Sequence, residues 1–187
     1  FGVYNDVKSA EIKTEVFQLP TTLFAEEEGS LANSGRWLQW HWAGGTAPGE
    51  CKHDTWIMAQ IFLRVKKLYQ AEGGAFPDPI LNLTWDYADP EEPSPAELAK
   101  EVNGYALADQ FDPKDPTKLT VGKGKLLLNF SQLKNDGSTS SGCWIYSGQW
   151  NENGNNMARR DNADPGNMGT FLNWTFAWPV NRRVLYN

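Results

Sequence analysis

The strongest regular pattern in this sequence is an apolar stripe with helical spacing between Asp54 and Glu72. Its members recur every three or four residues: Ile57, Met58, Ile61, Phe62, Val65, Leu68 and Tyr69. Asp54 is suited to cap the first turn, and Gly73-Gly74 stops the helix because glycine accepts the backbone angles found past a helix end. We therefore predict a helix over these residues, with its apolar face in a core.

The rest of the chain is less regular. The apolar run Val16 to Leu19, stopped by Pro20, indicates a strand. Glu26 to Gln39 is typical of a polar loop, with a turn at Asn33-Ser34-Gly35. These patterns predict little long-range regular structure before the helix.

Proline dominates the segment that follows the helix. Phe76 to Pro116 holds seven of the eleven prolines, which predicts a long irregular excursion. It contains one short helix, which begins with a capping box at Ser94-Pro95-Ala96-Glu97 and stops at Gly104. A further short helix is predicted around Phe130 to Asn135. From Ser138 onward the chain is rich in Gly, Asn and Trp.

Charge and hydropathy exclude some classes of protein. The net charge of −6 argues against a nucleic-acid partner, because phosphate binding needs a basic face. No run of eighteen apolar residues occurs, so no membrane-spanning helix is predicted. The acids concentrate between Asp86 and Pro116, which is typical of a solvated loop.

The nine tryptophans are the most unusual feature of the composition. Tryptophan suits a rigid wall beside a flat ligand, but it also fills cores under irregular loops. Exposed aromatic platforms are also used by carbohydrate-binding modules, so such a module stays open as an alternative.

Few residues offer independent chemistry. His41, Cys51, His53 and Cys143 are all the histidines and cysteines, and their spacing is not that of a zinc finger. The two cysteines are predicted to be either buried thiols or one disulfide. No nucleophile elbow, dinucleotide fingerprint or P-loop is present. The residues alone therefore name no reaction.

One segment carries a more specific signal. Glu28 to Gln39 resembles the "EG(S/T)xxNxxGRxQ" segment of molybdopterin oxidoreductases of the dimethyl-sulfoxide-reductase family. Its glycines allow tight turns, and its Asn, Arg and Gln offer donors to a phosphate-bearing cofactor. Further stretches in the same order resemble the catalytic subunits of respiratory formate dehydrogenases: Thr14 to Phe17, Leu19 to Thr22, Asn33 to Trp42, Gly142 to Tyr146, Asn156 to Pro165, and Trp178 to Asn187.

The resemblance implies a parent enzyme that oxidises formate to carbon dioxide at molybdenum or tungsten held by two pyranopterin guanine dinucleotides. The family's metal ligand, catalytic arginine and [4Fe-4S] cysteines lie upstream of this region. We therefore expect no catalytic residue and no metal ligand here, Cys51 and Cys143 included. Both chain ends suggest a piece of something longer, and such a piece is expected to be inactive.

The resemblance also implies a fold and an environment. The expected fold class is α/β, a mixed sheet with flanking helices and long aromatic-rich loops, part of the middle cofactor-enclosing domains. We divide the chain into three parts. Residues 1–75 hold a strand, the cofactor-facing loop and a helix, residues 76–137 form the acidic, proline-rich excursion, and residues 138–187 form the Trp/Gly/Asn-rich segment that leads to the next domain. Expected partners are the rest of the catalytic subunit and an iron–sulfur subunit, in the periplasm.

Six residues are the expected cofactor contacts: Glu28, Gly29, Asn33, Gly35, Arg36 and Gln39. Glu28 and Gly29 are expected to shape the turn. A buried ion pair that fixes the loop is the alternative for Arg36. Arg159, Arg160 and Asp161 are expected to line the cofactor funnel, attract formate or staple a loop. A subunit-docking role for the acidic excursion is a further alternative.

Overall fold

The computed structural model describes residues 8–158 and 175–179, and within them regular structure is short. The helices are α1 (Asp54–Glu72), α2 (Asp78–Leu81) and α3 (Pro95–Asn103). The strands are β1 (Gly29–Ala32), β2 (Trp37–His41), β3 (Tyr105–Ala106), β4 (Gln110–Asp112), β5 (Asp115–Val121), β6 (Thr139–Ser140), β7 (Trp150–Asn151), β8 (Gly154–Asn155) and β9 (Phe176–Ala177). Single 3-10 turns lie between them: η2 (Ser9–Glu11), η3 (Phe130–Gln132), η4 (Trp144–Tyr146) and η5 (Asn156–Ala158).

The strands form small antiparallel sheets. β1, β2 and β9 make a three-stranded sheet, and β3–β6, β4–β5 and β7–β8 are separate two-stranded pairs. The predicted combination of helices and strands is confirmed. Within the described residues, however, the strands form four separate antiparallel sheets and no single mixed sheet.

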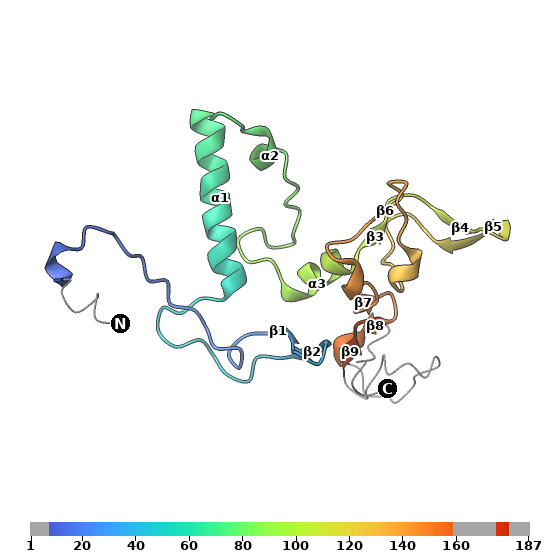
Figure 1. Cartoon of the computed structure of the whole chain (residues 1–187), viewed down its shortest axis with the longest axis horizontal. Coiled ribbons are helices and arrows are strands. Elements are labelled where there is room, and N and C mark those ends of the chain that lie inside the picture. Colours follow the sequence, from blue (N-terminus) through green and yellow to red (C-terminus); the bar gives the residue numbers. More distant parts are fainter. Residues whose placement is uncertain (1–7, 159–174, 180–187) are drawn as a thin grey trace.

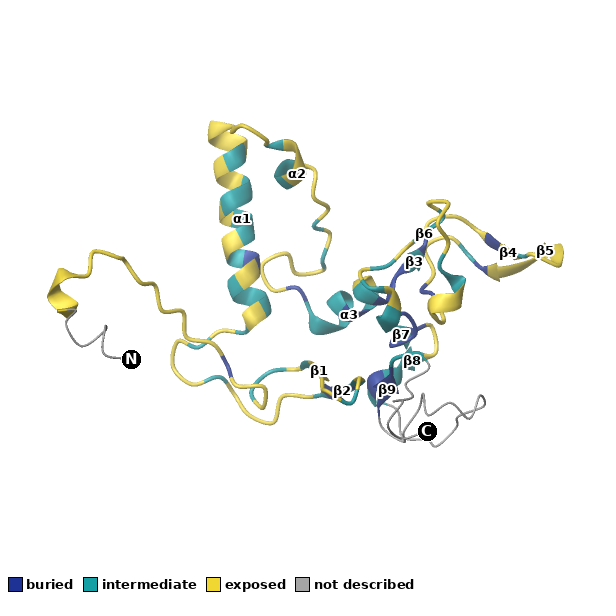
Figure 2. Ribbon diagram, viewed as in Figure 1, coloured by how far each residue is buried: buried dark blue, intermediate teal, exposed yellow. Residues whose placement is uncertain are grey.

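The molecule is open and elongated. α1 stands apart from the sheets, and the chain before β1 runs outward as an arm (Figure 1). Burial is concentrated where α3, β7 and β9 meet, whereas the arm is exposed (Figure 2). The main cluster of buried apolar side chains comprises Leu38, Trp40, Ala99, Met157 and Phe176. A second cluster comprises Ala106, Val121 and Leu127.

Helix α1 has the predicted bounds but not the predicted burial. The Gly73 N–H bonds the Tyr69 carbonyl at 3.0 Å with φ 72°, as a C-terminal stop requires. Ala59 is the one buried residue of the helix, and Met58 is 64% exposed. The prediction of a core face was wrong for this chain: none of the seven stripe residues is fully buried, because α1 packs against the four-residue α2 and the irregular segment that contains Trp85 rather than against a core. Asp54 is also not a cap: its carboxylate accepts a hydrogen bond from Thr21.

Helix α3 confirms its sequence signals. The Glu97 N–H donates to Ser94 Oγ at 3.2 Å, and the Ser94 N–H donates to the Glu97 carboxylate at 3.3 Å. Gly104 ends the helix at φ 99°, where a Cβ would lie 2.1 Å from the Ser140 carbonyl oxygen. Only glycine fits there without moving the backbone.

The last residue of α3 organises the packing around it. Asn103 is fully buried, and its side-chain amide donates to the carbonyls of Gly104 and Leu127. Its Oδ1 accepts from the N–H groups of Gly148 and Trp150. One buried amide thereby joins α3 to two loops and to the start of β7.

Two other predictions were wrong. Val16 to Leu19 is not a strand: no strand of the described residues pairs with it, and Phe17 is 76% exposed. Glu26 to Gln39 is not simply a loop, because β1 and β2 form a hairpin within it. The turn residues were identified correctly, but the strand pairing on each side was missed because β1 is short, mostly exposed and without an apolar–polar alternation. The helix expected over Phe130 to Asn135 is reduced to the single turn η3.

Candidate functional site

The β1–β2 hairpin places the six predicted contact residues. Gly29 pairs with His41 at its open end, and Leu31 pairs with Gln39 in the middle. Asn33, Gly35 and Arg36 lie in the turn. Four strand residues span roughly 13 Å at 3.3 Å per residue, so the hairpin separates the predicted contacts into two groups. Glu28 and Gly29 are at the open end, and the turn residues are at the tip.

The tip is a tight turn built by the asparagine. Asn33 Oδ1 accepts from the Gly35 N–H at 2.8 Å, and the Asn33 carbonyl accepts from the Arg36 N–H at 3.0 Å. A Cβ on Gly35 would lie 2.8 Å from Asn33 Oδ1, so the turn favours glycine there. Arg36 then adopts φ 65°, and the chain enters β2. The turn presents the Arg36 side chain in an exposed position.

Among the described residues, Arg36 has no partner for the buried ion pair that was its alternative role. It is exposed, and no carboxylate of the described residues lies within ion-pair distance of its guanidinium. Instead the guanidinium lies over the Trp178 ring, 6.0 Å from its centroid. A guanidinium held on an aromatic face keeps its N–H donors available for an anion.

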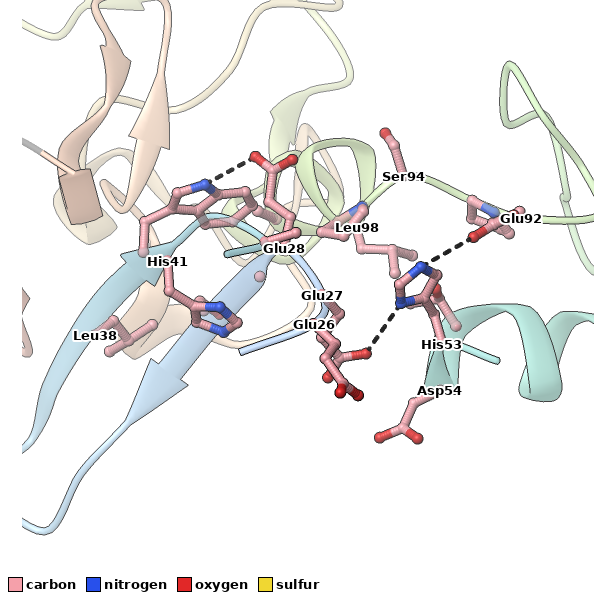
Figure 3. A pocket seen from close by; sticks show the side chains of 18 of the residues that line it. Glu26, Glu27, Glu28, Leu38, His41, His53, Asp54, Glu92, Ser94 and Leu98 are labelled. Atoms are coloured by element: carbon pink, nitrogen blue, oxygen red, sulfur yellow. Dashed lines mark hydrogen bonds and ion pairs between the residues drawn. The ribbon is translucent and has the colours of Figure 1, made fainter. Parts of the chain in front are cut away.

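A pocket of about 820 Å³ lies at the open end of the hairpin. Its walls come from the hairpin, the start of α1 and the start of α3 (Figure 3). The charged and histidine side chains that line it are Glu26, Glu27, Glu28, His41, His53, Asp54 and Glu92. No lysine or arginine is among the lining residues. This pocket is therefore unsuited to a phosphate group.

His53, at the start of α1, lies between two other parts of the pocket wall, which carry Glu27 and Glu92. Its Nδ1 lies 3.5 Å from a carboxylate oxygen of Glu27, and its Nε2 lies 3.9 Å from one of Glu92 (Figure 3). Nearby, Glu28 accepts a hydrogen bond from Trp40 Nε1 at 3.0 Å. Two of the predicted contacts, Glu28 and Gly29, thus line the pocket, whereas Asn33, Gly35, Arg36 and Gln39 do not.

The cysteines and histidines do not gather into a site. Both Cys51 and Cys143 are free, half-buried thiols. Within residues 8–158 and 175–179, no group of three or more His, Cys, Asp or Glu side chains is arranged to hold a metal ion. Arg159, Arg160 and Asp161 lie outside the described residues.

The tryptophans mostly pack rather than form an open platform. Six of the eight in the described residues are buried or half-buried, and Trp42 and Trp144 are exposed. Trp40 meets Trp150 edge-on, with centroids 5.2 Å apart. This arrangement does not favour the carbohydrate-binding alternative, which needs coplanar exposed rings.

Sequence comparison finds formate dehydrogenase subunits that are similar to this chain. The chain is 57% identical over 186 residues to the formate dehydrogenase-O major subunit of Escherichia coli. It is 54% identical over 187 residues to the formate dehydrogenase major subunit of Haemophilus influenzae. Each match covers 100% of the chain. Along its whole length, the chain is similar to a segment of these formate dehydrogenase major subunits.

The match extends to more distant formate dehydrogenases. The formate dehydrogenase 2 subunit alpha (cytochrome c-553) of Nitratidesulfovibrio vulgaris is 43% identical over 180 residues, which cover 94% of the chain. The chain spans 18% of the first relatives that it matches and 17% of this one. No family model matches the chain. Among the described residues, no helix is both long and apolar enough to cross a membrane.

Proposed function

We propose that this segment helps to enclose the metal-bearing pterin cofactor of a formate dehydrogenase catalytic subunit. The identity of 57% along the whole chain carries the proposal. The parent subunit would oxidise formate to carbon dioxide in a two-electron reaction. The molybdenum or tungsten bis-pyranopterin guanine dinucleotide would supply the redox chemistry when bound.

The polar groups at the two ends of the hairpin are suited to different ligands. The tip offers the exposed guanidinium of Arg36, which matches the geometry of a phosphate. The pocket offers carboxylates, which would repel a phosphate but accept hydrogen bonds from N–H groups. The tip therefore fits the phosphate-bearing part of the cofactor. We assign Arg36 to that contact, with Asn33 and Gly35 shaping the turn.

The remaining predicted contacts have supporting roles in this proposal. Glu28 holds Trp40 through its hydrogen bond, and Gly29 begins the strand pairing at the pocket. Gln39 is half-buried in the middle of β2. The division into residues 1–75, 76–137 and 138–187 stays a prediction, as does the periplasmic location. The rest of the catalytic subunit and an iron–sulfur subunit are the proposed partners.

The proposal is tested by changing Arg36 in the complete enzyme. Arg36→Gln removes the charge and the paired donors, and a charged hydrogen bond contributes about 1.5–3 kcal/mol. We expect roughly tenfold or greater weakening of cofactor retention, with a smaller loss for Arg36→Lys. To measure retention, the purified enzyme is diluted in steps, and the guanine nucleotide and metal released per subunit are quantified at each step.

Arg64→Gln is the matched control, because Arg64 is also exposed but lies on α1 and bonds only to Gln60 there. It should retain the cofactor like the unmodified enzyme. Equal retention in Arg36→Gln and Arg64→Gln would refute the assignment of Arg36.

A further inference from the structure

Arg36 and Trp178 are brought together by the register of one strand pair. In the antiparallel pairing of β2 with β9, Trp37 lies opposite Ala177 and Leu38 lies opposite Phe176. The same register continued by one residue sets Arg36 opposite Trp178. The Trp178 N–H indeed donates to the Arg36 carbonyl at 3.1 Å. Residues far apart in the sequence thus share the hairpin tip.

That register is anchored in the core. Leu38 and Phe176 are both buried in the main apolar cluster. The Thr175 hydroxyl, itself fully buried, donates to the Leu38 carbonyl at 2.7 Å. A shift by one residue would expose these side chains, so the position of Trp178 is firmly set.

The Trp178 ring also contacts the core. It packs against the main cluster and meets Tyr146 with ring centroids 6.0 Å apart. Its indole Nε1 is buried and has no hydrogen-bond partner among the described residues. The ring is therefore held by packing and by its backbone bond, rather than by a hydrogen bond of its indole.

We propose that Trp178 is a positioning residue for Arg36, and that its ring face holds the guanidinium in place for an anionic, phosphate-type ligand. This inference rests on the proposed role of Arg36. A free arginine side chain loses rotamer entropy when it binds, and a guanidinium already placed on an aromatic face loses less. Trp178 itself need not touch the ligand.

Two substitutions separate the ring face from the indole N–H. Trp178→Phe keeps an aromatic face, whereas Trp178→Leu keeps apolar volume without one. The probe is inorganic pyrophosphate, titrated into the 187-residue chain and followed by NMR. We expect Trp178→Leu to weaken binding by roughly twofold to fivefold, the range for an exposed cation–π contact, and Trp178→Phe to change it less.

The Arg36 side chain gives a second readout that does not depend on the ligand. Its Nε–H and δ-CH₂ resonances should carry a ring-current shift in the unmodified chain and in Trp178→Phe. That shift should disappear in Trp178→Leu. Trp56→Leu is the matched control. Trp56 lies on α1, is also half-buried, and also has a cation over its ring, that of Lys52. Thermal melting monitors the fold of each variant.

The outcomes distinguish this inference from the proposed function. If Arg36→Gln weakens pyrophosphate binding and Trp178→Leu does not, the positioning role is overturned and the role of Arg36 stands. If pyrophosphate does not bind, or Arg36→Gln leaves its binding unchanged, both fail. An unshifted Arg36 resonance in the unmodified chain also overturns the positioning role.

Discussion

Arg36 is the residue with the least ordinary backbone. Among the described residues it is the one non-glycine position with positive φ, at 65°. A left-handed conformation costs an L-residue about 1–2 kcal/mol, which a glycine would avoid. Strained backbone positions of this kind cluster at functional sites, where the side chain has a role that glycine could not fill.

Arg36→Gly should therefore stabilise the fold while it removes the function. Relief of the left-handed strain is opposed by the loss of the Trp178 contact, so we expect a net gain of at most about 1 kcal/mol. Denaturant melts of the 187-residue chain measure the gain, and pyrophosphate titration measures the lost binding. A destabilised variant would show that the arginine is retained for the fold.

At the scale of elements, α3 shows how local signals define a helix. The capping box sets the start of α3, and Glu97 has a second role there: its carboxylate accepts the Ala88 N–H at 2.9 Å. The hydrogen bond from the Ala88 N–H contributes most to lowering the pKa of Glu97, and the hydrogen bond from the Ser94 side chain contributes next. The capping box thus also ties the proline-rich excursion to the helix.

The contribution of Glu97 should depend on pH with a definite sign. Because its pKa is lowered in the fold, its stabilisation is present above the ordinary glutamate pKa of about 4.3 and is lost as pH falls through the folded value. Glu97→Gln should flatten stability against pH in the acid range.

Ser94→Ala removes the helix cap as well, with an expected loss of about 1 kcal/mol at neutral pH. Glu91→Gln is the control, because Glu91 lies on the same excursion outside the capping box. Urea melts between pH 3 and pH 7 measure both effects. A pH dependence unchanged in Glu97→Gln would contradict this account.

At the scale of the whole molecule, much apolar surface is exposed. The arm exposes Val16, Phe17 and Leu19, and α1 exposes Met58, Ile61 and Leu68. Surfaces of this kind mark interaction sites, which supports partners such as the rest of the proposed catalytic subunit.

The 187-residue chain by itself should not oxidise formate. Activity needs a metal ligand and a complete cofactor enclosure, and this segment is proposed to supply one wall. The measurement is reduction of a dye acceptor by formate, with the complete enzyme as positive control. Turnover by the purified chain, in proportion to its concentration, would overturn the proposed division of roles.

The sequence by itself determined the local elements. Helical periodicity with a glycine stop predicted α1, and a capping box with Gly104 predicted α3, because caps and periodicity act within a few residues. The motif from Glu28 to Gln39 and the stretches around it also indicated the resemblance to formate dehydrogenases, and the chain is 57% identical over 186 residues to one such major subunit. The sequence did not predict the β1–β2 hairpin, because β1 lacks an alternation of apolar and polar residues.

Only the tertiary structure decided which distant residues meet. The register of β9 on β2 places Trp178 on Arg36, and burial of Leu38 and Phe176 fixes that register. It also left part of the apolar face of α1 exposed, at Met58, Ile61 and Leu68, since burial depends on what packs against a helix and not on the helix's own pattern. Long-range pairing depends on the whole packed core, so no local pattern encodes it.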